Sequence, residues 1–108
     1  MSRWDVSSVE RMEDMFSYSS FNGDISGWDT RSLRNCSSMF ANSDFNMDIS
    51  CWDISNVRYM TTMFYKSKMN RDLSKWDLTG LPYEGKINMF FRTPMTDKRE
   101  WWPKGYEG

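Results

Sequence analysis

The chain has 108 residues, a net charge of −1 at neutral pH, a pI near 5.4 and no histidine. This length predicts one domain, residues 1–108, and the lack of histidine excludes Ser-His-Asp triads and most zinc sites. No run of 18 apolar residues is long enough to span a membrane, and no P-loop or GxGxxG motif occurs, so we expect neither a membrane segment nor a cofactor.

Tryptophan-aspartate pairs recur every 24 residues, beginning at Trp4, Trp28, Trp52 and Trp76. A fixed period of this length is typical of an array of stacked repeats. The repeats cover residues 4–27, 28–51 and 52–75, followed by a divergent fourth repeat, 76–95, and a C-terminal cap or tail, 96–108. The fourth repeat carries two extra residues before Met89.

Within the first repeat, Val9, Met12, Met15 and Phe16 are spaced as on one face of a short helix. Ser7 and Glu10 have capping-box spacing at its start. The short segment around Ile25 is bounded by polar residues and is predicted to be a strand. Each repeat is therefore expected to contain a turn, a short helix, a loop and a short strand.

Two groups of positions stay constant between repeats. The apolar group, which includes the tryptophans, phenylalanines and most methionines, is predicted to form the core. The aspartates after each tryptophan could be imagined as stacked calcium ligands, but we expect them to accept hydrogen bonds from turn backbone. Asn22, Asn46 and Asn70 are predicted to bond between repeats.

The pattern WDxSxVxxMxxMF, followed by FNxDIS before the next tryptophan, is similar to the BspA-like leucine-rich-repeat family of the DUF285 type. That family occurs in bacterial surface proteins and in some viral and protist proteins. The resemblance implies an α/β, leucine-rich-repeat-like solenoid of about four 24-residue repeats, with short parallel strands on one side and short helices on the other. It also implies protein binding or adhesion and no catalytic residues.

Positions that vary between repeats are the candidates for binding. Met47, Cys51, Arg71 and Lys75 flank the predicted strands and would form a small mixed apolar and basic patch, unless they are ordinary surface. The tail offers a second candidate, because Trp101 and Trp102 lie beside basic residues, as anchors of protein interfaces often do. The competing interpretation is that these tryptophans fold back over the last repeat.

The first repeat lacks the FNxDIS segment that precedes every other tryptophan, so its apolar end is expected to be uncovered. Exposed apolar patches mark association sites. We therefore expect Trp4, Val6 and Val9 to contact another chain, with a homodimer as one form of this contact.

Cys36 and Cys51 occupy different positions of the repeat, which argues against a disulfide between them. No secretory signal is recognised at the start of the chain. The expected location is cytoplasmic, in a host cell if the protein is viral.

These features favour a non-enzymatic protein–protein interaction module; one form of it would be a small phage or mobile-element protein that binds and blocks a host protein. The alternative is a self-assembling structural component joined end to end, since residues 1–50 carry eight acidic and four basic residues whereas residues 51–108 carry seven and ten. Binding of single-stranded nucleic acid through the basic half ranks third.

Overall fold

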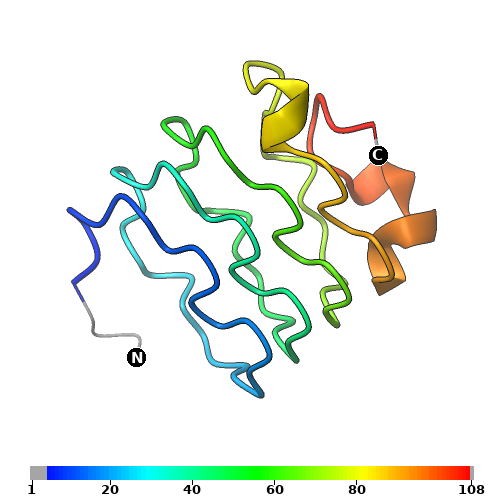
Figure 1. The fold of residues 1–108 in the computed structure, drawn as a ribbon, viewed down its shortest axis with the longest axis horizontal. Coiled ribbons are helices and arrows are strands. Elements are labelled where there is room, and N and C mark those ends of the chain that lie inside the picture. Colours follow the sequence, from blue (N-terminus) through cyan, green and yellow to red (C-terminus); the bar gives the residue numbers. More distant parts are fainter. Residues whose placement is uncertain (1–4, 108) are drawn as a thin grey trace.

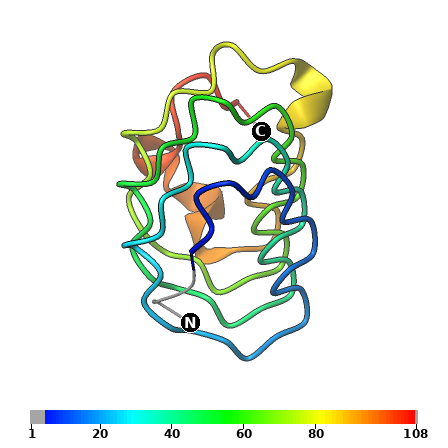
Figure 2. The ribbon, with the colours of Figure 1, turned by 90° about the vertical axis from the view of Figure 1, so that its left-hand side faces the viewer.

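The computed structural model describes residues 5–107, in which the repeats lie side by side as successive turns of the chain (Figure 1). The first repeat forms one end of the stack and the C-terminal segment forms the other. Figure 2 looks onto the first repeat, with the later repeats behind it. Parallel bridges join Arg11 to Asn35 and Asn35 to Tyr59, so equivalent positions of neighbouring repeats are in register.

The segment 12–19 of the first repeat is a row of consecutive tight turns. The Met15 N–H donates to the Met12 carbonyl, and the Ser19 N–H donates to the Phe16 carbonyl. The third residues of these two turns, Asp14 and Tyr18, have φ angles of 58° and 59°. A positive φ at this position is what a type II turn requires. Later repeats build the same segment in the same way, with positive φ at Ser38, Asn42, Thr62, Lys66, Asn88 and Arg92.

The expected α/β solenoid of strands and helices is wrong. Among residues 5–107 the helices are three short 3₁₀ segments, η1 (Tyr83–Gly85), η2 (Pro94–Asp97) and η3 (Arg99–Trp101), and no strand is present, only isolated bridges. An α-helix needs consecutive N–H groups bonded four residues back along the same chain. In this protein every second N–H of the expected helix donates to a carbonyl of the next repeat instead. The positive φ angles of Asp14 and Tyr18 also interrupt any α-helical conformation.

The expected helix start and strand are also absent. The Ser7 hydroxyl donates to Oδ1 of Asp5 at 2.7 Å, so it does not cap a helix. At the expected strand, the N–H and hydroxyl of Ser26 both donate to Oδ1 of Asp24, which makes a turn. Asp and Asn favour such side-chain-stabilised turns over extended backbone.

Apolar columns run through the centre of the stack, as the repeat pattern predicted. Phe16, Phe40, Phe64 and Phe90 stack face to face with ring centroids 5.5–5.6 Å apart. Each of these phenylalanines also packs at 6.2–6.4 Å against the tryptophan that follows it in the chain. Because a single repeat cannot cover its own apolar face, this stacking is what stabilises the fold.

The fourth repeat absorbs its two extra residues at η1 and then returns to register. Pro82 precedes this helix, and the backbone of Gly85 lies so close to Arg58 that a side chain would collide with it. Met95 is fully buried and Trp102 packs on Phe90, so both occupy the positions of Phe21 and Trp28 in the first repeat. The repeat therefore continues to Trp102 rather than ending at residue 95.

The residues after Trp102 close the C-terminal end of the stack. Lys104 pairs in parallel with Asp77, and Gly105 has a φ of 88° where its Cα approaches the backbone of Thr79. The ring of Tyr106 packs edge-on against Phe90 and Trp102. This end of the core is thus covered by the chain itself.

Candidate functional site

The first repeat presents an apolar hollow at the opposite end of the stack. The hollow is lined by Val6, Val9, Met12 and Met15, with Asp5, Arg11 and Glu13 beside them. These apolar side chains belong to the columns that form the core in the later repeats. We call this surface the N-terminal face.

Burial shows how the first repeat differs from its copies. Met15 is 37% exposed, whereas Met39, Met63 and Met89 in the same column are 0% exposed. The side chains of repeats two to four are covered by the repeat that precedes them. No segment within residues 5–107 covers Met15 in this way, so the hollow is a place where the stack could continue.

Two of the three residues predicted to mediate association line this hollow. Val6 is buried at its edge and Val9 is half-buried. Trp4 lies outside the described residues. The sequence pattern assigned Met12 and Met15 to the core and not to this surface. The Met15 column, which is buried in repeats two to four, could have identified Met15 as part of it.

The rim of the N-terminal face carries paired charges. Arg11 donates to the carboxylate of Glu13 at 2.7 Å, and this bond lowers the pKa of Glu13 and raises the pKa of Arg11. Glu10 pairs with Arg34 of the next repeat at 3.3 Å. Both pairs are exposed to solvent, so they contribute charge to the rim more than stability.

The predicted patch on the variable columns is brought together only in part. Met47, Cys51 and Arg71 line one shallow hollow. Asp24 and Asp48 line it as well, so it is not the basic patch that was expected, and Arg71 donates its Nε to the carbonyl of Asn46. Lys75 is exposed and does not line this hollow. The pKa of Asp48 is lowered mainly by hydrogen bonds from Ser50, and the charge of Lys75 adds to this shift.

The tail tryptophans are both half-buried against the core. Trp102 donates its Nε1 to the carbonyl of Met95 at 2.7 Å, and Trp101 accepts from the N–H of Leu73 through its own carbonyl. Lys98 lies over the ring of Trp101 at 4.7 Å. The interpretation that these residues cover the last repeat therefore fits the structure better than an exposed anchor.

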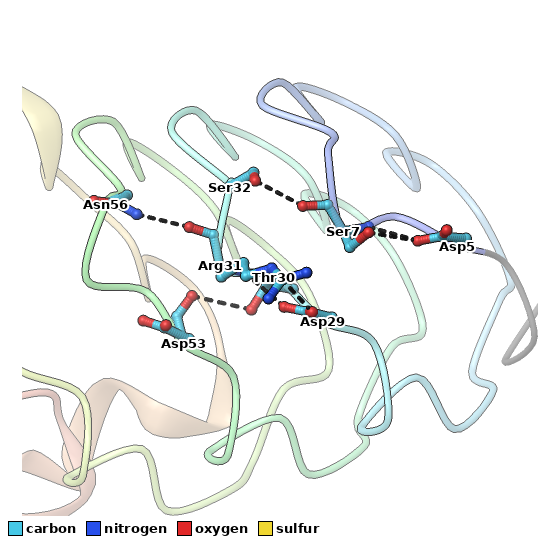
Figure 3. Close-up of polar contacts among 8 residues, drawn as sticks. All are labelled: Asp5, Ser7, Asp29, Thr30, Arg31, Ser32, Asp53 and Asn56. Carbon is cyan, nitrogen blue, oxygen red and sulfur yellow. Dashed lines mark hydrogen bonds and ion pairs between the residues drawn. The ribbon is translucent and has the colours of Figure 1, made fainter.

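The repeated aspartates accept hydrogen bonds from turn backbone, as predicted. Asp53 accepts from the N–H and the hydroxyl of Ser55, and these bonds lower its pKa. The same arrangement lowers the pKa of Asp5, Asp24, Asp48, Asp72 and Asp77. Figure 3 shows the turn of Asp5 and Ser7 and the related turn of Asp29, which accepts only from the N–H of Arg31. It also shows bonds that link neighbouring repeats, from Thr30 to the Asp53 carbonyl and from Ser32 to the Ser7 carbonyl.

The predicted asparagine links are confirmed. The N–H of Asn46 donates to Oδ1 of Asn22 at 2.7 Å, and the N–H of Asn70 donates to Oδ1 of Asn46 at 2.8 Å. Both cysteines are free, Cys36 in the core and Cys51 at the surface. Burial raises the pKa of Cys36 to about 12.

Two further searches concern only the described part of the chain. Within residues 5–107 no group of His, Cys, Asp and Glu side chains could hold a metal ion. In the same range, no helix has both the length and the apolar character that crossing a membrane would need.

Comparison with known proteins gives one match. The family model described as "Mycoplasma protein of unknown function, DUF285" matches residues 1–101, which is most of the chain. No curated protein and no solved structure matches significantly. The chain belongs to the DUF285 family.

Proposed function

We propose that this chain is a non-enzymatic protein-binding module and that its N-terminal face is the binding surface. The observation that carries the proposal is the hollow around Met15. Its side chains occupy core columns, yet Met15 is 37% exposed and Val9 only half-buried, because no described residue stacks on them from this side. An apolar surface that remains open on one side of a repeat stack favours association with another protein.

The other end of the stack supports this choice by contrast. There Trp102 and Tyr106 pack on Phe90, the last phenylalanine of the column. Within residues 5–107 the core is thus covered at one end by Trp102 and Tyr106, whereas Met15 at the other end is exposed. The hollow that includes Met47 and Cys51 is a weaker candidate because most of its lining is polar: Asp24, Ser26, Asp48 and Arg71.

A matched pair of variants tests the proposal. Met15→Glu places a charge on the N-terminal face, whereas Phe91→Glu changes an exposed apolar residue, 44% accessible, near the other end. Bound proteins would be recovered from a lysate of the source cell with the wild-type chain and with each variant. We expect one protein to be retained by wild type and Phe91→Glu and lost with Met15→Glu.

Thermal unfolding of both variants provides the folding control. Because Met15 and Phe91 are both partly exposed, either substitution should leave the cooperative transition in place. Equal retention by all three proteins would contradict the assignment of the N-terminal face, and so would the absence of any retained protein.

A further inference from the structure

The backbone hydrogen bonds between repeats run in one direction along the segment of tight turns. In the first repeat, the N–H groups of Met12, Asp14, Phe16 and Tyr18 donate to carbonyls of the second repeat at 2.8–3.1 Å. The same four positions of the second and third repeats donate to the repeat that follows each of them. Along residues 12–18 and their copies, each repeat therefore offers N–H groups toward the C-terminal end and carbonyls toward the N-terminal end. On either side of this row the bonds run the other way, since Arg34 and Asn35 donate their N–H groups to the Glu10 carbonyl and Asp44 donates to the Ser19 carbonyl.

The first repeat consequently presents a row of carbonyls on the N-terminal face. In the second repeat the accepting carbonyls are those of Asn35, Ser37, Met39 and Ala41. Their counterparts in the first repeat are the carbonyls of Arg11, Glu13, Met15 and Ser17, which accept no hydrogen bond from any residue in 5–107. Beside this row the first repeat presents a donor instead of an acceptor. The N–H groups of Asn46 and Asn70 each donate to the asparagine of the preceding repeat, whereas the Asn22 N–H has no such acceptor in the described chain.

This polarity defines the chemistry of a partner. An ordinary β-strand presents N–H and C=O groups alternately along one edge, so half of its groups would face carbonyls. Only a chain folded in the same row of turns offers N–H groups from every second residue along one side. Such a chain would also supply apolar side chains to the hollow formed by Val9, Met12 and Met15.

A second copy of this chain does not meet these requirements. In a symmetric dimer, carbonyl rows and hollows would face each other. In head-to-tail contact, the donors would come from the Asn88–Arg92 segment. However, the N–H of Leu78 donates to the carbonyl of Lys104. The C-terminal tail therefore already lies against the fourth repeat, where the first residues of another repeat would have to pack. Backbone N–H groups of Phe90 and Met89 also face the Tyr106 hydroxyl, where they partly offset the rise in its pKa that burial causes.

Charge adds a further requirement. The first repeat, residues 4–27, carries five acidic residues and one basic residue. A partner repeat with basic side chains would be attracted to this end of the stack. The third repeat of this chain, residues 52–75, is an example of the required chemistry, since it carries five basic and two acidic residues.

The geometry points to a specific occupant of the N-terminal face: a basic repeat of the same WDxSxVxxMxxMF kind, carried by a different polypeptide. Its alternate N–H groups would donate to the carbonyls of Arg11, Glu13, Met15 and Ser17. This inference rests on the proposed function and names the class of partner.

The test uses the full chain and a synthetic peptide of residues 52–75, with binding followed by isotope-edited NMR of the protein. A second peptide replaces the amides that carry the Thr62 and Phe64 N–H groups by esters, which removes two donors of the forward row. A control peptide carries one ester at Thr61, whose N–H donates no hydrogen bond in the described chain. We expect the parent and control peptides to shift resonances of residues 6–17, and the double ester to bind about tenfold more weakly.

The outcomes separate the two proposals. Equal affinity of the parent and double-ester peptides would overturn the donor-row inference while leaving an apolar binding face. Failure of the parent peptide to bind at millimolar concentration would overturn the inference without affecting the lysate experiment. A homo-oligomer of the full chain that Met15→Glu dissociates and Phe91→Glu does not would assign the face to a second copy and would likewise overturn it.

Discussion

The Nζ atom of Lys98 lies 2.6 Å from Oδ1 of Asn70, at the end of the row of asparagines that links the repeats. Asn22 and Asn46 each accept from the backbone N–H of the next asparagine in the row, but the equivalent position of the fourth repeat holds Thr96 instead of an asparagine. The ammonium group of Lys98 supplies the missing donor. A side chain 28 residues away thus terminates a backbone pattern that the repeats established.

Removing this ammonium group should destabilise the C-terminal end of the stack. Lys98→Met keeps the aliphatic part of the side chain but leaves Oδ1 of Asn70 without a donor. We expect the free energy of unfolding to fall by about 1 kcal/mol, the usual net value of one hydrogen bond. Chemical denaturation measures this difference.

Lys75→Met is the matched control, because Lys75 is exposed and donates no hydrogen bond to a described residue. Its unfolding free energy should stay within about 0.5 kcal/mol of the wild type. If Lys98→Met and Lys75→Met lower the free energy of unfolding equally, then the contact between Lys98 and Asn70 adds no stability.

The aspartate turns predict a loss of stability in acid. Hydrogen bonds from Ser55 lower the pKa of Asp53 in the folded chain, and five other aspartates have the same arrangement. A folded-state pKa below the unfolded value of about 3.9 stabilises the fold above that pH. The contribution disappears as pH falls through the lowered folded-state pKa, so unfolding free energy should drop below about pH 4.

Serine-to-alanine substitution identifies the source of this acid sensitivity. Ser55→Ala removes the hydroxyl that donates to Asp53, whereas Arg31, at the same position of the second repeat, already lacks one. Ser55→Ala should be less stable than wild type at pH 6, and the difference should narrow near pH 2. A difference independent of pH would show that the carboxylate of Asp53 is not involved.

The sequence predicted the side-chain bonds correctly because they are local or lie between identical positions. Asp53 reaches only two residues along the chain, and Asn46 contacts the same position of the neighbouring repeat. The helix prediction failed because the spacing of Met12 and Met15 suits a tight turn as well as a helix. Which one forms depends on where the intervening N–H groups donate, and that is decided by the next repeat.

The N-terminal face and the tail show a second limit. The apolar columns indicated that the first repeat would be open, but they could not reveal the direction of the hydrogen bonds on that face. Trp102 was placed outside the repeats because the two extra residues before Met89 shift the period from 24 to 26. Its stacking on Phe90 becomes visible only when the insertion is absorbed at η1.

Glycine at a left-handed position should stabilise the chain. Lys66 has a φ of 56°, its side chain is exposed, and its N–H donates to the carbonyl of Phe91, a bond that glycine retains. A non-glycine residue in this region costs about 1–2 kcal/mol of folded-state stability. This cost exceeds the free energy that glycine loses through its greater unfolded-state entropy. Lys66→Gly should therefore raise the unfolding free energy by about 0.5 kcal/mol, measured by thermal or chemical denaturation.

Lys75→Gly serves as its control, since Lys75 is equally exposed but does not have a positive φ. Here glycine brings only the entropic cost, and the unfolding free energy should decrease. If both glycine variants lose stability equally, then the backbone at Lys66 is not strained.

Two tryptophans of the same column should differ in how well they tolerate phenylalanine. The Nε1 atom of Trp52 donates to the carbonyl of Ile25 at 3.0 Å, whereas the buried Nε1 atom of Trp76 has no partner in the described chain. Both substitutions lose similar apolar contact. Trp52→Phe should therefore reduce unfolding free energy by about 1 kcal/mol more than Trp76→Phe, and identical losses would argue against the Trp52 bond.

Cysteine modification provides a direct test of the core. Cys36 is 0% exposed with its pKa raised to about 12, whereas Cys51 is exposed at the surface hollow. Only the thiolate reacts with alkylating agents. Iodoacetamide at pH 8 should therefore modify one thiol of the folded chain, and peptide mass spectrometry should locate it at Cys51. The denatured chain should take up two groups, whereas rapid modification of Cys36 in the folded chain would mean that the second repeat opens on the timescale of the reaction.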